Sequence, residues 1–233
     1  RGSENTNFMV SGRYLTQDGL FRYNSDDYRM ANLRANGSIN LTDWLELSSN
    51  FDYSNRTYFN PLNVGEGGGI WRNIADEGHP MAPMLNPDGT LTHSAAYTVG
   101  DFYYGKNGLD FDRSVLRNTT ELTGGFFDDR LQLTADFSFQ RTTDDERQRR
   151  VPVPYSRAPG SIEYVGLQYN DLRNTHDKTN YLATNLYGSY ETTFADRHAF
   201  RAMLGVNYEE STFQRLRAQR NGLIFEDATD LNL

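Results

Sequence analysis

The stretch YRMANLRANGSINLTDWLELSSNFDY, from Tyr28 to Tyr53, alternates apolar and polar residues on both sides of a short break. Small and apolar residues occupy one set of alternate positions, and Asn, Arg, Ser, Glu and Asp occupy the other. Because successive side chains of a strand point to opposite faces, the pattern predicts two strands that each have an apolar and a polar face. The break at Thr42-Asp43-Trp44 predicts the turn of a hairpin.

The hairpin fixes a specific pairing if its two strands are arranged symmetrically about Asp43. Position 34 then lies opposite position 52, and both belong to the polar set. Opposite charges that face each other across two strands attract. We therefore predict a cross-strand ion pair between Arg34 and Asp52.

The same alternation recurs along the chain and predicts seven strands. They cover approximately residues 5–15, 28–42, 45–53, 114–126, 131–140, 182–192 and 200–208. Short turns near residues 43, 128 and 196 alternate with long connections at 16–27, 57–112 and 141–179, and the polar tail from Ser211 resembles the start of another long loop. Short turns at one end and long loops at the other are typical of outer-membrane barrels. Soluble β-sandwiches have more uniform connections.

The predicted fold class is therefore all-β, an antiparallel transmembrane β-barrel segment with long extracellular loops. Single-chain bacterial barrels have an even number of strands, starting at eight. Seven strands would leave two edges of unpaired backbone in lipid, which is energetically costly. We expect a segment of a larger barrel. The chain starts at Arg1, close to the first predicted strand and with no signal-peptide pattern, which we expect of a mature or truncated chain.

Composition narrows the possible functions. The 233 residues carry a formal net charge of −8, whereas a nucleic-acid binder needs a basic face. No cysteine is present, which excludes disulfides and thiolate metal sites. The 15 Tyr and 14 Phe stand out in a chain with only 37% hydrophobic residues, as expected if one strand face meets lipid and the other meets water.

Several motifs resemble the barrel of SusC/RagA-like TonB-dependent outer-membrane transporters. They are Ser11-Gly12-Arg13-Tyr14 with Gln17-Asp18-Gly19-Leu20-Phe21, Asn32-Leu33-Arg34-Ala35-Asn36 leading to Leu41-Thr42-Asp43-Trp44-Leu45, Asn86-Pro87-Asp88-Gly89, and Thr193-Phe194 to His198 followed by Leu204-Gly205-Val206-Asn207-Tyr208-Glu209. The motifs extend over essentially the whole chain. They are turn and strand patterns and include no catalytic signature.

The resemblance implies a 22-stranded barrel in the bacterial outer membrane that contains an N-terminal plug. It further implies a SusD-like surface lipoprotein as a cap, the TonB complex as the energy source, and glycans or peptides as the imported nutrients. Residues 1–233 would then be a partial barrel domain, because the plug, the TonB-contacting segment and the remaining strands have no counterpart in this sequence. Outer-membrane lipid and lipopolysaccharide would surround it.

The sequence contains no hydrolase, metalloprotease or P-loop pattern, so we predict neither an enzyme nor a cofactor. The four histidines have no metal-ligand spacing. The charged run 144–150 is interpreted as a solvated loop cluster, with a cation or lipopolysaccharide phosphates as the alternative ligands. Trp44 and Tyr53 suit the two aromatic girdles of a membrane barrel.

Two sets of candidate site residues remain. The loop aromatics could stack on sugar rings or peptide side chains, or pack the loops together. They are Tyr58, Phe59, Trp71, Tyr97, Phe102, Tyr103, Tyr104, Tyr155, Tyr164 and Tyr169. The polar set of the strands should face the barrel lumen, and it comprises Asn32, Arg34, Asn36, Glu46, Asn50, Asp52 and Asp136.

Two other functions stay open at this level. One is a complete small barrel or adhesin-like surface protein that binds a ligand through its loops. The other is a secreted β-protein that recognises carbohydrate. Glycan and peptide importers share the same barrel pattern, so both substrate classes remain candidates.

Overall fold

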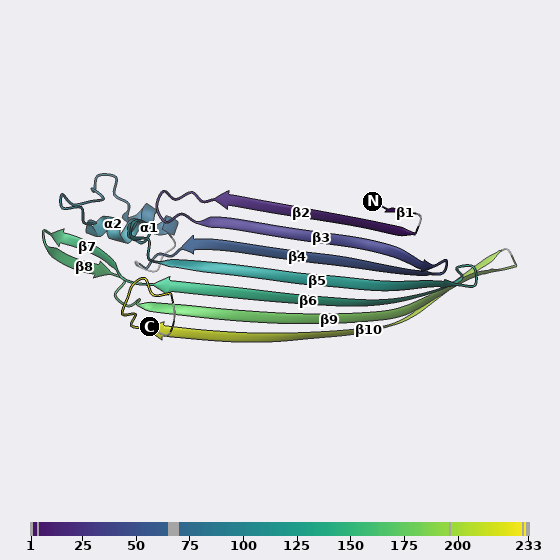
Figure 1. Cartoon of the computed structure of the whole chain (residues 1–233). Coiled ribbons are helices and arrows are strands. Elements are labelled where there is room, and N and C mark those ends of the chain that lie inside the picture. The colour runs from purple at the N-terminus through teal and green to yellow at the C-terminus, as the bar shows by residue number, and fades with distance from the viewer. Residues whose placement is uncertain (1, 4, 65–69, 196, 230, 232–233) are drawn as a thin grey trace.

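One antiparallel sheet dominates the computed structural model of the chain (Figure 1). The structure describes residues 2–3, 5–64, 70–195, 197–229 and 231. Within them the sheet has eight strands in the order β1-β2-β3-β4-β5-β6-β9-β10, and it is not closed into a barrel. Neighbours in the main sheet are also neighbours in sequence, except that β9 follows β6 after a small hairpin.

The seven predicted strands are all present, which confirms the predicted fold class. They are β2 (Thr6–Asp18), β3 (Asp27–Thr42), β4 (Leu45–Pro61), β5 (Gly108–Phe126), β6 (Leu131–Arg150), β9 (Asp171–Phe194) and β10 (His198–Asn221). The eighth strand, β1 (Gly2–Ser3), is a two-residue addition at the edge of β2.

The predicted strand ends were wrong on the side of the long connections. The sequence predicts loops at residues 141–150, 171–179 and 211–221, but these residues continue β6, β9 and β10. In these extensions both faces are largely polar, so the period-two signal disappears from the sequence. The ladder continues regardless, because its hydrogen bonds join backbone groups and do not require apolar side chains.

The hairpin register is the predicted one. Arg34 lies opposite Asp52, and Nε of Arg34 donates to Oδ2 of Asp52 over 2.7 Å. Alternation then assigns every strand residue to one of two faces. We call the face that carries Arg34 and Asp52 the polar face, and the face that carries Ala35 and Phe51 the apolar face.

Apolar side chains form a continuous belt across the apolar face, although no second layer covers it. It includes Val10, Leu33, Leu47, Leu122, Leu133, Phe137, Leu186, Leu204 and Val206. Leu204 is 83% exposed and Val206 is 70% exposed. Exposed apolar surface of this extent in a soluble monomer would be unusual, because such patches normally mark an interaction surface.

The belt crosses the strands at an angle. Its edge nearest the long connections is Tyr14 on β2 and Tyr208 on β10. In the strand register, Tyr208 lies in one row with Phe8 of β2. The row runs from Tyr208 through its successive partners Thr184, Phe137, Thr120, Ser49 and Gly37 to Phe8. Phe8 is six residues from Tyr14, and six strand-to-strand steps separate β2 from β10, so the edge moves by one residue per strand.

This shift translates into a tilt of the strands. The belt edge moves by one residue, about 3.3 Å along the strand, for each step of about 4.8 Å to the next strand. The ratio of these two lengths corresponds to a tilt of about 35°. Membrane barrels have strand tilts of roughly 35–45°. Between Ala31 and Leu41 on β3 the belt then has a height of about 27 Å, close to the roughly 25 Å apolar band of such barrels.

Most of the well-buried residues lie at the end of the sheet where the long connections gather (Figure 1), whereas Thr134 and Ala183 are buried within the sheet itself. There α1 (Ile70–Glu77), α2 (His93–Thr98), α3 (Gly100–Tyr104), the hairpin β7 (Val153–Ala158)–β8 (Ser161–Val165) and residues 222–229 form what we call the loop assembly. Its core consists of Val64, Leu91, Ala95, Ala96, Val153, Tyr155 and Val165, with a second cluster of Val151, Leu172, Leu223 and Ala228. No helix among the described residues is long and apolar enough to span a membrane.

Gly166 provides a test of how tightly the loop assembly is packed. Its φ of +77° disfavours any residue with a Cβ, and a Cβ there would be 2.8 Å from the Val64 carbonyl oxygen. We expect Gly166→Ala to destabilise the loop assembly by more than the roughly 1–2 kcal/mol that a left-handed conformation costs. Amide hydrogen exchange of Val64 and Val165 in the full-length protein would measure this.

Gly160 supplies the matched control, because its φ is +74° and nothing lies within 4 Å of an added Cβ. Gly160→Ala should therefore lower the stability only by the roughly 1–2 kcal/mol that a left-handed backbone conformation costs. Equal loss of protection in the two variants would contradict the close packing of Gly166 on Val64.

Candidate functional site

The predicted lumen-facing residues share one face, as expected. Asn32, Arg34 and Asn36 on β3, Glu46, Asn50 and Asp52 on β4, and Asp136 on β6 all project from the polar face. Asp136 accepts a hydrogen bond from Asn185 Nδ2 on β9 over 2.9 Å. That this face lines a lumen stays a prediction.

Cross-strand ion pairs follow the polar face toward the loop assembly. Arg113 binds Asp144 through two guanidinium nitrogens, and Arg215 binds Asp177 in the same bidentate way. Arg173 donates from Nη2 to Oε1 of Glu146 over 3.1 Å. Bidentate arginine–carboxylate pairs fix side-chain orientation as well as charge, so this part of the wall is pre-organised.

The charged run 144–150 is a strand segment, and its interpretation as a loop cluster was wrong. Asp144 and Glu146 point to the polar face, whereas Asp145 and Arg147 point to the opposite face. Asp145 contacts Nδ1 of His176 at 2.6 Å. Because alternation separates these charges onto two faces, they do not form one anion or cation site. Within the described ranges, no group of three potential ligands could hold a metal ion.

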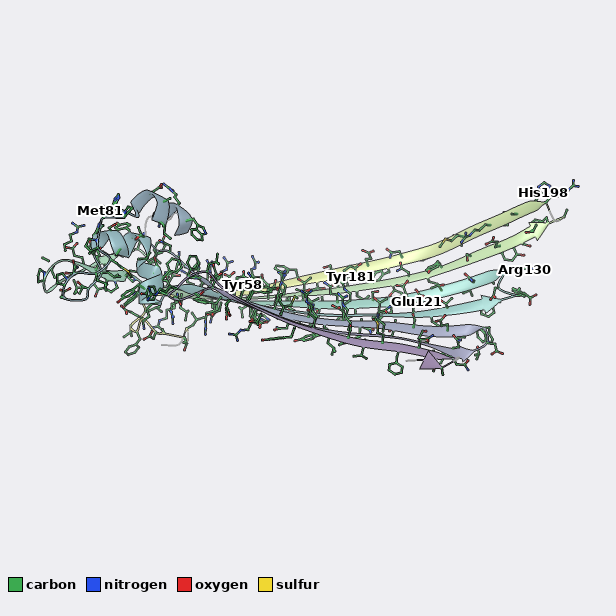
Figure 2. The ribbon with its side chains drawn as sticks, turned by 90° about the horizontal axis from the view of Figure 1, so that it is seen from above. Tyr58, Met81, Glu121, Arg130, Tyr181 and His198 are labelled. Carbon is green, nitrogen blue, oxygen red and sulfur yellow. The ribbon has the colours of Figure 1, made fainter. Side chains whose placement is uncertain are left out.

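Two of the predicted loop aromatics, Tyr58 and Phe59, lie at the end of β4 and not in a loop. Tyr58 is on the polar face, and Figure 2 places it at the end of the sheet nearest the helices. Its ring stacks on Phe111 of β5, with centroids 4.8 Å apart and planes at 24°. Tyr28 of β3 lies opposite Tyr58 on its other side. Phe59 points to the other face.

Sequence reasoning missed Tyr28 and Phe111 as members of this aromatic row. Phe111 fell inside the predicted 57–112 loop, where no register could be assigned. The available signal was the alternation of Phe111, Arg113 and Val115 with Asp110, Asp112 and Ser114. That alternation is weak because both sets contain polar residues.

Most of the remaining loop aromatics contact side chains outside the predicted set. Trp71 and Phe102 both contact Phe21, at centroid distances of 5.6 and 4.4 Å. Phe102 and Tyr155 are buried, at 4% and 5% exposed. The others also have partners inside or beside the loop assembly: Tyr103 on Tyr23, Tyr97 on His93, Tyr104 on Glu226, and Tyr169 under Arg150. Tyr164, on β8, is 44% exposed. Ligand contact by these residues stays a prediction.

A buried carboxylate connects the loop assembly to the strand ends. Asp101 of α3 is 1% exposed and accepts from the Val64 backbone N–H over 3.0 Å and from Asn107 Nδ2. Asn107 in turn exchanges two hydrogen bonds with the backbone of Val151. Burial raises the pKa of Asp101 to about 6, although the hydrogen bonds from Asn107 and Val64 act in the opposite direction. Asp101 and Asn107 together therefore link α3 to the segments around Val64 and Val151.

The raised pKa predicts a pH dependence of the loop assembly. Between the ordinary pKa of 3.8 and about 6, the folded assembly binds more protons than the unfolded one. Asp101 therefore adds stability as the pH falls through 6, about 2 kcal/mol near pH 4 and about 3 kcal/mol well below the ordinary pKa, and this contribution is absent above pH 7. Amide hydrogen exchange of Val64 and Val151, corrected for intrinsic rates, would measure it.

Asp101→Asn is the control for this prediction, because an amide does not titrate. In that variant, the exchange protection of Val64 and Val151 should no longer include the increase that protonation of Asp101 causes between pH 7 and pH 4. A pH dependence that is the same in the variant and in the unchanged protein would show that other groups are responsible.

These features define a class: part of the wall of an antiparallel barrel with structured connections at one end. Comparison with solved structures is consistent with this class. The RagAB peptide importer in its closed-closed state matches all of the chain with a TM-score of 0.71 and 16% identity. The RagAB peptide transporter matches it with 0.74 and 15%, and the open-open state of the importer matches 99% of it with 0.73 and 16%.

The likeness to SusC/RagA-like transporters is thereby confirmed at the level of the fold. The chain spans about a quarter of the length of these solved chains. No family model and no curated protein matches the sequence.

Proposed function

We propose that the chain is part of the barrel wall of an outer-membrane importer of peptide or glycan nutrients. In this proposal the TonB complex supplies energy through an N-terminal part of the whole protein, and a SusD-like surface lipoprotein caps the barrel. Residues 1–233 contribute a partial barrel domain. The observation that carries the proposal is the tilted apolar belt on a sheet whose fold matches a peptide importer.

The belt requires an apolar neighbour along its whole length. Burying apolar surface is worth about 25 cal/mol per Å², and the exposed side chains of Leu204, Val206 and Val10 would lose this stabilisation in water. Lipid satisfies the belt, while water in a lumen satisfies the charged polar face. A secreted sheet would instead need a second layer over the belt, and none of the described residues supplies one.

The strand extensions support the proposal that the two ends of the sheet lie on opposite sides of the outer membrane. Beyond the belt, the apolar face becomes polar, with Arg29, Asp112 and Lys178 among its residues. Such residues suit the lipopolysaccharide sugar layer and water, so the loop assembly would lie outside the cell. The short turns would lie on the periplasmic side. Peptides are favoured over glycans as the substrate because the matching solved structures are peptide importers.

Lipid contact by the belt can be tested with Leu186→Arg. Leu186 lies in the middle of the belt on β9, and an arginine at the bilayer midplane costs about 2–4 kcal/mol. We expect the full-length variant to insert poorly into lipid vesicles and to lose the difference in gel migration between heated and unheated samples that folded barrels show. Ser189→Arg is the matched control on the polar face of the same strand, and it should fold normally. Equal insertion of both variants would be inconsistent with a lipid-facing belt.

Import can be tested in the native bacterium. Deleting the gene for the full-length protein should reduce uptake of fluorescent peptides, and a protonophore should reduce uptake in the undeleted strain to the same level. Labelled glycans provide the second substrate class. Uptake of both probes at the undeleted rate would refute the importer function.

A further inference from the structure

The wall just below the loop assembly carries a row of side chains with the features of a ligand site. The row consists of Tyr28, Tyr58 and Phe111, followed on the next strands by Glu146, Thr175 and Arg217. We propose that this row binds a short peptide that has a free carboxylate and lies across the strands. The inference rests on the proposed importer function and deepens it by naming wall residues and a ligand class.

The row is long enough for a peptide. It spans six strands, from β3 to β10, and a strand spacing of about 4.8 Å gives a length of about 24 Å, or roughly seven extended residues. The Tyr58–Phe111 stack provides a flat apolar surface at one end of it. A hollow of about 320 Å³ adjoins the row at Tyr28 and Tyr58 and is also lined by Gln17 and Asn60.

Buried polar atoms without partners lie along the other end of the row. Thr175 is only 7% exposed, and its Oγ1 has no hydrogen-bond partner among the described residues. In the adjacent row, Gln148 Oε1 and Arg173 Nε are likewise buried and unpartnered. Such atoms are rare in folded proteins and are costly to leave unsatisfied. Together they offer an acceptor, a donor and a hydroxyl, which match the C=O and N–H groups of a peptide.

Positive charge exceeds negative charge around the row, although the whole chain is acidic. The row and the two rows that flank it on the polar face contain five arginines and three acids: Arg56, Arg113, Arg173, Arg215, Arg217, Asp144, Glu146 and Asp177. Each acid is paired with one arginine. Two positive charges are therefore left over.

The two surplus arginines are Arg56 and Arg217. Neither makes an ion pair or a side-chain hydrogen bond with another described residue, although the charge of Arg217 also acts on nearby Asp177. Both side chains are exposed. Arg56 also lies directly opposite Arg113, and like charges in opposite positions repel. A ligand carboxylate would remove this repulsion, and arginine is suited to bind carboxylates with two parallel hydrogen bonds.

The charge distribution also gives the peptide a direction. Asp26 lines the β2 side of the hollow, whereas Arg217 lies at the β10 end of the row. Asp18 also lines the hollow, but it belongs to the apolar face. The amino terminus of the ligand should therefore point toward β2, and its carboxyl terminus toward β10. A neutral glycan would use neither Asp26 nor the surplus arginines.

Binding to the purified full-length protein tests the site. The probes are a tryptic digest of casein, the same digest with its carboxylates amidated, and oligogalacturonate as an acidic glycan. We expect the protein to retain casein peptides, and the Arg56→Gln/Arg217→Gln double variant to bind them about tenfold more weakly. Amidation should weaken binding to the unchanged protein by a similar factor and have little effect on the double variant. Tyr58→Ala should weaken binding of both digests.

Two matched controls lie on the apolar face. Tyr14, which is 70% exposed, is the control for Tyr58, and Arg141, whose Nε donates to Asn180, is the control for the arginines. Tyr14→Ala and Arg141→Gln should bind like the unchanged protein. The site is refuted if the double variant binds normally, if amidation weakens both proteins equally, or if oligogalacturonate binds more tightly than the peptides.

Uptake of the same digest by cells separates failure of the site from failure of the importer function. Peptide uptake that persists at the full rate in the Tyr58→Ala and double-variant strains refutes the site and leaves the importer. Peptide binding that responds to the variants as expected, in a protein whose deletion leaves uptake unchanged, supports the site and refutes the importer.

Discussion

The uninterrupted antiparallel ladder from β2 to β10 is the constraint on which every other feature depends. Once Arg34 is opposite Asp52, the pairing of each further strand assigns its residues to a face and to a row. A slip of one residue would exchange the two faces of a strand. It would place the aspartates and arginines of the polar face among the belt residues. The two-faced chemistry of the wall thus follows from register, and register follows from backbone hydrogen bonds.

The register also allows the strand tilt to be calculated from the positions of the apolar residues. The belt edge moves by one residue per strand between Tyr14 and Tyr208, and that shift gives the strand tilt. A flat stack of strands with no shift would instead keep the belt perpendicular to the strands. The tilt, and the belt height calculated with that tilt, agree with the dimensions of membrane barrels.

The sequence predicted the fold better than it predicted the candidate site. The hairpin around Asp43 and its ion pair could be found because one face is apolar and the other is polar. Beyond the belt this contrast is lost, so the sequence predicts loops at 141–150, 171–179 and 211–221, where the strands continue. The row of Tyr28, Tyr58 and Phe111 could not be found for the same reason. Its members are far apart in sequence, and only the register of the extended strands brings them together.

The strand extensions have a mechanical consequence for the loop assembly. A paired sheet that continues past the belt is a stiff collar, because bending it would break several backbone hydrogen bonds at once. The collar ends where β6 stops at Arg150 and β9 begins at Asp171, and those two residues are themselves joined by a bidentate ion pair. Any swing of the loop assembly must therefore pivot above this point, which leaves the wall below it stationary while the outer rim moves.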